Sequence, residues 1–283
     1  MSATTAAYRA GWHRGLVEFR QSLTSPGDLF STLFWPLLMV VVLIFVRDSE
    51  FGSSGLLLGT LFLPSVIGMN IAANGMLTTA GLLAIEREDG TLLRAKATPN
   101  GMQGYVVGKI VTVAGTTLIA LLVVLIPGVF LVDGLAIGSV GAWVGLAGIV
   151  ALGIVATLPI GLVIGSLFDN PRNAGLANLL MLGVIGISGI FYPLTALPTL
   201  VQWIAQVFPV YWLGLGARSV LLPDSAAAVE LGSSWRTLET VGVLGIWAIA
   251  GLVLAPIVLR RMARRESGSA LAKRREQMLQ RTR

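Results

Sequence analysis

Cysteine is absent from the sequence, and histidine occurs once, as His13. The absence of cysteine excludes disulfide bonds, thiol catalysis and cysteine-ligated metals in this chain. A lone histidine without a cluster of carboxylates predicts no metal site, and no polar residues group into the pattern of a catalytic centre. We therefore expect the chain to have no catalytic residues and to bind no metal.

Charged residues are also scarce. They make up 12% of the 283 residues, whereas 55% are hydrophobic, and a soluble domain has about a quarter of its residues charged. This composition predicts an all-α, multi-pass integral membrane protein with one membrane domain. The net charge of +6 does not by itself indicate nucleic acid, because the position of the charges matters more than their sum. We expect no nucleic-acid partner.

Six long apolar segments follow residue 28, and a helix needs about 20 such residues to cross a bilayer. The second, third and fourth are longer than a crossing requires, so they must tilt, kink or extend into water. The membrane domain is thus expected over 29–259, with six transmembrane helices. The segments cover about residues 29–46, 56–85, 105–132, 140–168, 174–192 and 238–259.

The first 28 residues do not have the pattern of a signal peptide and predict an amphipathic helix. Basic residues fall mostly on the sides away from its apolar face. We expect such a helix in the membrane interface; the alternative is a helix packed on a soluble core, of which this chain offers little. Large apolar residues recur every three or four positions, which places them on one helical face, and they are Tyr8, Trp12, Leu16, Phe19 and Leu23.

Lysine and arginine are distributed unevenly between the two sides of the expected spans. If the N-terminus is cytoplasmic, 17 of the 20 basic residues lie on the cytoplasmic side, in agreement with the bias of membrane proteins toward basic residues inside. We therefore expect the protein in the cell (inner) membrane with both termini in the cytoplasm. Nine of these residues lie in the tail 260–283, where contact with anionic lipids is the expected role.

The densest run of mixed charge lies at 86–99, between the second and third segments. Gly90 and Thr91 can break the incoming helix and cap a short new one, which Pro99 then ends. A short charged helix between two spans would contact a partner outside the membrane, whereas the alternative is an ordinary solvated loop. The residues assigned to this contact are Glu86, Arg87, Glu88, Gly90, Thr91, Leu93 and Arg94.

The stretch 189–221, between the fifth and sixth segments, is too apolar for a simple loop. Pro198 and Pro209 bracket one short helix and 211–221 could form another, and neither is long enough to span a bilayer. Two interpretations remain open, a short re-entrant hairpin or lid at the outer surface and an aromatic belt that anchors the sixth helix. The residues of interest are Phe191, Tyr192, Pro193, Pro198, Trp203, Pro209 and Arg218.

Few polar side chains lie inside the spans. Asn70, Asn74 and Thr78 recur every four residues on one face of the second segment, and Asn178 lies in the fifth. Hydrogen bonding between helices and lining of a substrate path both fit these positions. The middles of the segments contain no ionisable residue, which weakens the case for an ion-coupled secondary transporter or channel. A membrane enzyme would need a catalytic polar cluster, which the sequence does not have.

Two motifs in these positions are specific in combination. Glu-Arg-Glu-x-Gly-Thr-Leu begins at Glu86, and Phe-Tyr-Pro…Leu-Pro…Trp…Pro…Arg extends from Phe191 to Arg218. With the N-terminal helix and six spans, they make the chain resemble the ABC-2 family, the membrane subunits of ATP-binding cassette exporters, including the drug-resistance type. In that family the first motif would be the coupling helix that docks on the ATPase, and the second would shape the exit. Leu93 departs from the pattern, because many relatives carry an acidic residue there.

The ATPase itself is expected on another polypeptide. No Gly-x-x-x-x-Gly-Lys-Ser/Thr motif is present; the nearest sequence, Gly104 to Lys109, has one residue too few between its glycines and no hydroxyl residue after the lysine. The resemblance implies a permease subunit rather than an enzyme. It would work with two ATPase copies, which would bind ATP and Mg²⁺, and with a second membrane subunit, identical or related.

The cargo is only broadly indicated. We expect no cofactor on this chain. The apolar spans suit export of a lipophilic or amphiphilic compound, such as a drug, an antibiotic or a lipid-linked molecule. Polysaccharide export is the alternative within the resembled family.

Overall fold

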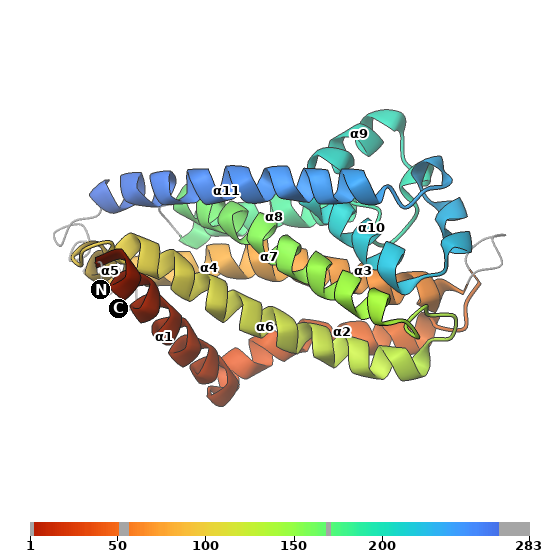
Figure 1. Ribbon diagram of the computed structural model, residues 1–283, viewed down its shortest axis with the longest axis horizontal. Helices are drawn as coiled ribbons and strands as arrows, with labels where there is room; N and C mark the ends of the chain where they lie inside the picture. The colour runs from red at the N-terminus through yellow and green to blue at the C-terminus, as the bar shows by residue number, and fades with distance from the viewer. Residues whose placement is uncertain (1–2, 51–56, 168–170, 266–283) are drawn as a thin grey trace.

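The computed structural model describes residues 3–50, 57–167 and 171–265, and this part of the chain is helical with no strand (Figure 1). The long helices run along the long axis of the molecule and form a bundle, which confirms the expected all-α fold. The elements are α1 (Ala3–Thr24), α2 (Pro26–Val46), α3 (Leu58–Ala73), the π-helix η1 (Asn74–Thr78), α4 (Thr79–Glu88), α5 (Thr91–Lys96), α6 (Gly101–Leu131), α7 (Val140–Leu167), α8 (Pro171–Gly186), η2 (Leu194–Ala196), α9 (Thr199–Val207), α10 (Pro209–Leu221), η3 (Asp224–Val229), η4 (Leu231–Ser233) and α11 (Thr237–Arg265).

Five helical stretches in the described residues are long and apolar enough to cross a membrane. They are α2, the continuous α3–η1–α4 stretch from Leu58 to Arg87, α6, α7 and the part of α11 up to Leu259. A sixth crossing results if α9 and α10, which are bent by 86° relative to each other, count as one span. Five of the six expected spans are thus confirmed as long and apolar enough, and the sixth candidate, α9 with α10, is not the expected fifth segment.

The expected fifth span, 174–192, corresponds to the shorter helix α8. This helix has 16 residues and ends at Gly186, so at ~1.5 Å per residue it is about 24 Å long, against a hydrocarbon core of about 30 Å. The apolar sequence continues, but the backbone turns, because Gly189 adopts the left-handed conformation with φ +70°. The Tyr192 hydroxyl donates a hydrogen bond to the Gly186 carbonyl and holds this turn against the helix end.

Helix α1 packs along α6 with the two backbones in contact. A Cβ at Gly11 would lie 2.2 Å from the Gly104 carbonyl oxygen, and a Cβ at Gly15 would lie 2.5 Å from the Gly108 carbonyl oxygen. Only residues without a side chain allow this approach. Trp12, on the expected apolar face, is exposed, and its position in the membrane interface stays a prediction.

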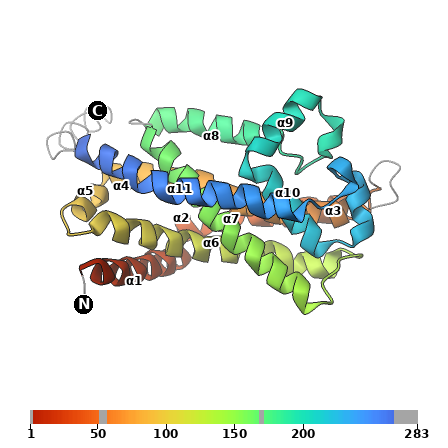
Figure 2. The same cartoon turned by 45° about the horizontal axis from the view of Figure 1, so that its top comes forward.

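Helix α10 lies in the largest apolar core. The side chains of Tyr211, Leu213 and Leu215 are fully enclosed, and α10 packs so closely on α3 that a Cβ at Gly68 would lie 2.6 Å from the Gly214 nitrogen. Helix α9 lies on the outside of the bundle (Figure 2). Both expected short helices are therefore present, with the second inside the bundle. Their re-entry from the outer surface stays a prediction.

Candidate functional site

The turn between α4 and α5 carries the expected coupling motif. Gly90 has φ +79°, a left-handed conformation that glycine adopts without a Cβ clash, and the six-residue helix α5 follows. The Asp89 carboxylate accepts a hydrogen bond from the Thr91 N–H at 2.7 Å. The turn and the short helix are confirmed with Gly90 as the N-cap, but Thr91 is the first residue of α5 and not its cap. The Thr91 hydroxyl instead accepts a hydrogen bond from Arg94 Nη2 at 2.8 Å.

Helix α5 turns one face toward the bundle and one face outward. Leu92 and Ala95 are buried in an apolar cluster with residues of α4, α6, α7 and α11. Leu93 is half-buried, and Arg94 and Lys96 are exposed. The outward face of α5 is therefore basic, and its shape is fixed by the turn at one end and by the buried leucine beneath it.

Glu86 and Arg87 do not lie on this outward face, because both are buried. The Glu86 carboxylate has partners inside the chain: Lys109 Nζ at 2.6 Å, Arg14 Nη2 at 3.3 Å and the Tyr105 hydroxyl, which donates a hydrogen bond at 2.6 Å. Glu86 and Arg87 are thus not the surface charges that the sequence suggested, and their role in coupling stays a prediction. The Glu88 side chain lies outside the described part of the structure.

Five side chains form what we call the charge cluster: Arg14 and Glu18 of α1, Glu86 of α4, and Tyr105 and Lys109 of α6. The Lys109 ammonium lies between the two carboxylates, 2.6 Å from Glu86 and 2.8 Å from Glu18. Arg14 also contacts both carboxylates, with Glu18 at 2.7 Å. Two cations balance two anions, as burial requires, because an unpaired charge in the interior is very costly.

The electrostatics of Glu18 follow from this environment. Burial raises the pKa of the Glu18 carboxyl, but the Lys109 charge and the hydrogen bonds from Lys109 and Arg14 outweigh burial and bring the pKa below its ordinary value. Thr112 of α6 adds a hydroxyl donor at 3.2 Å. Glu18 is therefore an anion at neutral pH, and it ties α1 to α6.

Most of the charge cluster was not among the residues singled out from the sequence. Arg14 and Glu18 lie far from Glu86 along the chain and are brought to it by the packing of α1 on α6, whereas Tyr105 and Lys109 lie in the first turns of α6, which follows α4 and α5. Two signals were available, because Gly11-x-x-x-Gly15 and Gly104-x-x-x-Gly108 match in spacing and Lys109 directly follows the second pair. The two glycine pairs indicate a close contact between two helices. Lys109 lies beside that contact, where a buried cation requires a counter-charge.

The polar residues of the second span do not converge on a cavity. Asn70 is buried, and its Nδ2 donates to the Val66 carbonyl at 3.0 Å, while Asn74 Nδ2 donates to the Asn70 carbonyl at 3.0 Å. Thr78 is exposed, and Asn178 lies in α8 with its side chain outside the described residues. These amides are satisfied by their own helix, and a substrate path along them stays a prediction.

A π-helical turn follows directly after α3 and includes Asn74. A Cβ at Gly75 would lie 1.8 Å from the Thr157 hydroxyl oxygen of α7, so the turn lies directly against that helix. The π-turn is a departure from regular helix along the expected path. Because π-turns inside α-helices frequently occur at functional sites, this part of the second span is a candidate for a functional role.

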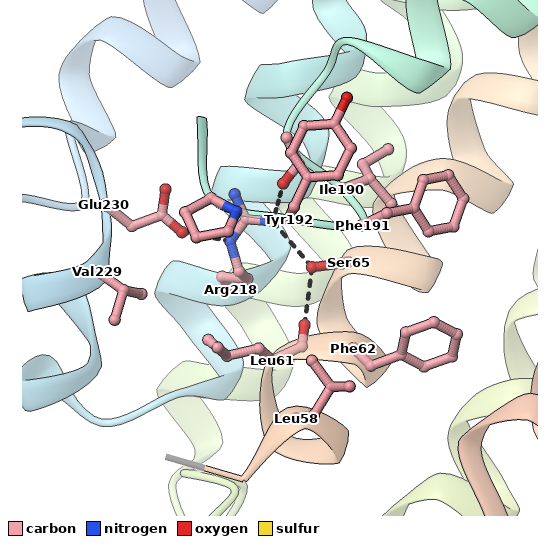
Figure 3. Close-up of a pocket in the computed structure, with 12 residues that line it drawn as sticks. Leu58, Leu61, Phe62, Ser65, Ile190, Phe191, Tyr192, Arg218, Val229 and Glu230 are labelled. Atoms are coloured by element: carbon pink, nitrogen blue, oxygen red, sulfur yellow. Dashed lines mark hydrogen bonds and ion pairs between the residues drawn. The ribbon is translucent and has the colours of Figure 1, made fainter. Parts of the chain in front are cut away.

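At the opposite end of the bundle, a second buried ion pair joins α10 to the segment that precedes α11 (Figure 3). Arg218 Nε lies 2.6 Å from Glu230 Oε1, and Arg218 Nη1 donates to the Ser65 hydroxyl at 2.8 Å and the Gly189 carbonyl at 3.5 Å. The side chains border a narrow cavity of about 30 Å³. Arg218 thus links α10 to α3, to the turn after α8 and to the loop before α11.

The other expected residues of this region lie around that ion pair or on α9. Pro198 precedes α9 and Pro209 is the first residue of α10, as the sequence suggested. Trp203 is 69% exposed on α9. Phe191, Tyr192 and Pro193 line the cavity.

Comparison with known families identifies the chain. A model of the ABC-2 family transporter protein matches residues 46–257, from the end of α2 to the last turns of α11. The chain belongs to the ABC-2 family. ABC-2 membership implies a permease of the ATP-binding cassette type, and such permeases generally work with an ATPase subunit. Curated proteins give no match to the chain. The match starts after α1, so the charge cluster joins the matched region to an element that precedes it.

Proposed function

We propose that this ABC-2 chain is the membrane subunit of an exporter that moves a lipophilic or amphiphilic compound out of the cell, with ATP hydrolysed by a separate ATPase subunit. The observation that carries the proposal is helix α5, which presents exposed basic residues beyond a left-handed turn at Gly90 and is anchored by Leu92. A short helix of this kind offers an ATPase subunit a rigid docking element.

Coupling is mechanical in this proposal. ATP closes the ATPase dimer, and the motion displaces α5 and the spans to which it is attached. Helix α4 continues into the second span, and the charge cluster attaches α4 to α6 and to α1. The displacement of α5 therefore reaches two spans and the N-terminal helix together. The chain itself is a transport subunit and not an enzyme, and ATP and Mg²⁺ bind to the partner.

The complex has two membrane subunits, identical or related, and two ATPase copies. One chain carries one α5, whereas an ATPase dimer has two docking clefts. In the cell (inner) membrane both termini and α5 face the cytoplasm, and the basic tail contacts anionic lipids. Mass measurement of the purified complex should give equal numbers of membrane and ATPase subunits; one membrane subunit for two ATPases would overturn this stoichiometry.

The cargo follows from the character of the spans, which provide almost entirely apolar surface. A drug, an antibiotic or a lipid-linked molecule fits such a surface better than a polysaccharide does. Stimulation of ATP hydrolysis by candidate compounds, measured on the purified complex in vesicles, identifies the class. Stimulation by a hydrophilic glycan, with none by amphiphiles, would contradict this assignment.

The docking role is tested by reversing one charge on the outward face of α5. Arg94→Glu should release the ATPase during purification of the complex, while expression and insertion remain normal because the side chain is exposed. The matched control is Asp224→Lys, an exposed charge reversal at the opposite end of the bundle, which should retain the ATPase. Full retention in both variants would refute docking through Arg94.

A further inference from the structure

We propose that the groove between α6 and α7 binds one acyl chain of a membrane phospholipid. The two helices lie close together at the ends joined by residues 132–139 and separate toward their other ends in both views (Figures 1 and 2). A groove of about 500 Å³ opens between them, lined from Ile110 to Leu125 on α6 and from Trp143 to Val155 on α7. Every residue that lines it is apolar.

The groove has a buried floor and an exposed rim. Its floor includes Leu121, Leu146 and Val150, which are between 4% and 6% exposed. On the rim, Ala147 and Ala151 of α7 are exposed. Their small side chains, one turn apart, keep the groove open along α7, so it opens sideways from the bundle and not toward its ends.

The length and volume of the groove match a hydrocarbon chain. Along α7 the lining covers twelve steps from Trp143 to Val155, which at ~1.5 Å per residue make about 18 Å. A volume of about 500 Å³ is open along that length. A single hydrocarbon chain fits, because carbon atoms pack at about 3.5–4.0 Å.

The position of the groove indicates which molecule supplies that chain. Helices α6 and α7 are both long and apolar enough to span the membrane, so a groove that opens sideways between them faces the hydrocarbon of the bilayer. An apolar groove left empty would lose dispersion contacts along its whole lining. Phospholipid is the hydrocarbon always present there, and the length of about 18 Å slightly exceeds one leaflet, about half of a 30 Å core.

Trp143 gives the bound chain its direction. Its indole Nε1 donates a hydrogen bond to the Ile137 carbonyl at 3.0 Å, which fixes the ring at the end of the groove near the loop 132–139. Tryptophan prefers the level of the lipid headgroups. We therefore place the headgroup at the Trp143 end and the end of the acyl chain toward Ile110.

The test uses the complex in vesicles of phosphatidylcholine that contain a small share of phosphatidylcholine with a diazirine in its acyl chain. After illumination, peptide mapping should show labelling of the α6–α7 groove about fivefold above labelling of the exposed apolar faces of α2 and α11, equivalent to about 1 kcal/mol. Even labelling over all these faces would overturn the proposal.

Variants of the rim sharpen the test. Ala151→Trp, and separately Ala147→Trp, should fill the groove and reduce its labelling about fivefold, again about 1 kcal/mol. The control Ile249→Trp replaces a side chain that is 68% exposed on α11 and should leave the labelling unchanged. Unchanged labelling in both alanine variants would refute the groove as the binding site. If neither variant folds, the labelling map of the unchanged protein decides.

Occupation by a second copy is tested separately. Because the chain contains no cysteine, Leu118→Cys on the rim introduces a unique thiol. We expect no disulfide-linked dimer from this variant on oxidation in vesicles. Efficient formation of the dimer would show that a second copy covers the groove, and would overturn the lipid assignment.

Discussion

The ammonium of Lys109 lies 2.6 Å from the carboxylate of Glu86, and the lysine side chain is 3% exposed. This pair joins α6 to the last turn of α4, which leads into the turn at Gly90 and then into α5. Because Glu18 and Arg14 of α1 complete the charge cluster, three helices are joined at a single point near the proposed docking helix. Displacement of α5 is therefore expected to move all three.

Removing the lysine should destabilise the chain strongly. Lys109→Met removes the cation that contacts both Glu86 and Glu18, and breaking a buried ion pair costs about 3–5 kcal/mol. Thermal unfolding in detergent measures the loss. The double variant Lys109→Met with Glu86→Gln should recover part of it, since fewer uncompensated charges remain. The control Arg47→Met breaks an exposed pair with Asp48 and should cost about 0–1 kcal/mol. A Lys109→Met protein as stable as the unchanged protein would contradict the role of the charge cluster.

The packing of α1 on α6 should not tolerate a single added methyl group. Gly11→Ala and Gly15→Ala place a Cβ against carbonyl oxygens of α6, and overpacking of this kind costs about 1–3 kcal/mol. Both variants should unfold at lower temperature. Gly27→Ala meets nothing within 4 Å and should be neutral or slightly stabilising. Equal unfolding temperatures for all three variants would show that the helices can separate without cost.

The turn at Gly90 should be needed for docking as well as for folding. A side chain in the left-handed conformation costs about 1–2 kcal/mol, and a branched one such as valine is worse. Gly90→Val should therefore displace α5 and lower the amount of ATPase that co-purifies, while the bundle remains inserted. The reference variant is Gly138→Val, an exposed loop position with no neighbour within 4 Å. Full ATPase binding by Gly90→Val would show that docking does not depend on this turn.

The polar face of the second span has two candidate roles, lining of a substrate path and helix packing. Measurement of substrate preference distinguishes them. Asn74 donates only to its own helix in the contacts described above, so Asn74→Leu should leave assembly intact. If the π-turn borders the path, the variant should change the ranking of transported compounds in vesicles. Loss of assembly without any separate change in transport would assign Asn74 to helix packing instead.

The sequence predicted those features that depend on local chemistry. Gly90 within a charged run correctly indicated a left-handed turn and a short helix, because few other residues accept that backbone conformation. Apolar length identified the long spans, but it also extended the expected fifth span to residue 192. Apolarity does not report where a backbone turns, and α8 ends at Gly186, before the left-handed turn at Gly189.

Long-range pairing is what local patterns could not provide. Glu86 was expected on the surface because it lies in a charged loop, yet partners from α1 and α6 enclose it. Arg218 was singled out for its motif, but its partners Ser65 and Glu230 come from other segments. In both cases a charge became buried because distant residues supplied its counter-charge or hydrogen bond, which only the folded arrangement reveals.

The most direct measurement is a cross-link between α5 and the ATPase. Because the chain contains no cysteine, Arg94→Cys introduces a unique thiol on the outward face of α5, and Asp224→Cys introduces one at the opposite end of the bundle. Each complex is treated with a short thiol–amine cross-linker. The Arg94→Cys complex should give a product that joins this chain to the ATPase, and the Asp224→Cys complex should give none. No product from Arg94→Cys, or equal products from both variants, would contradict the assignment of α5 as the docking helix.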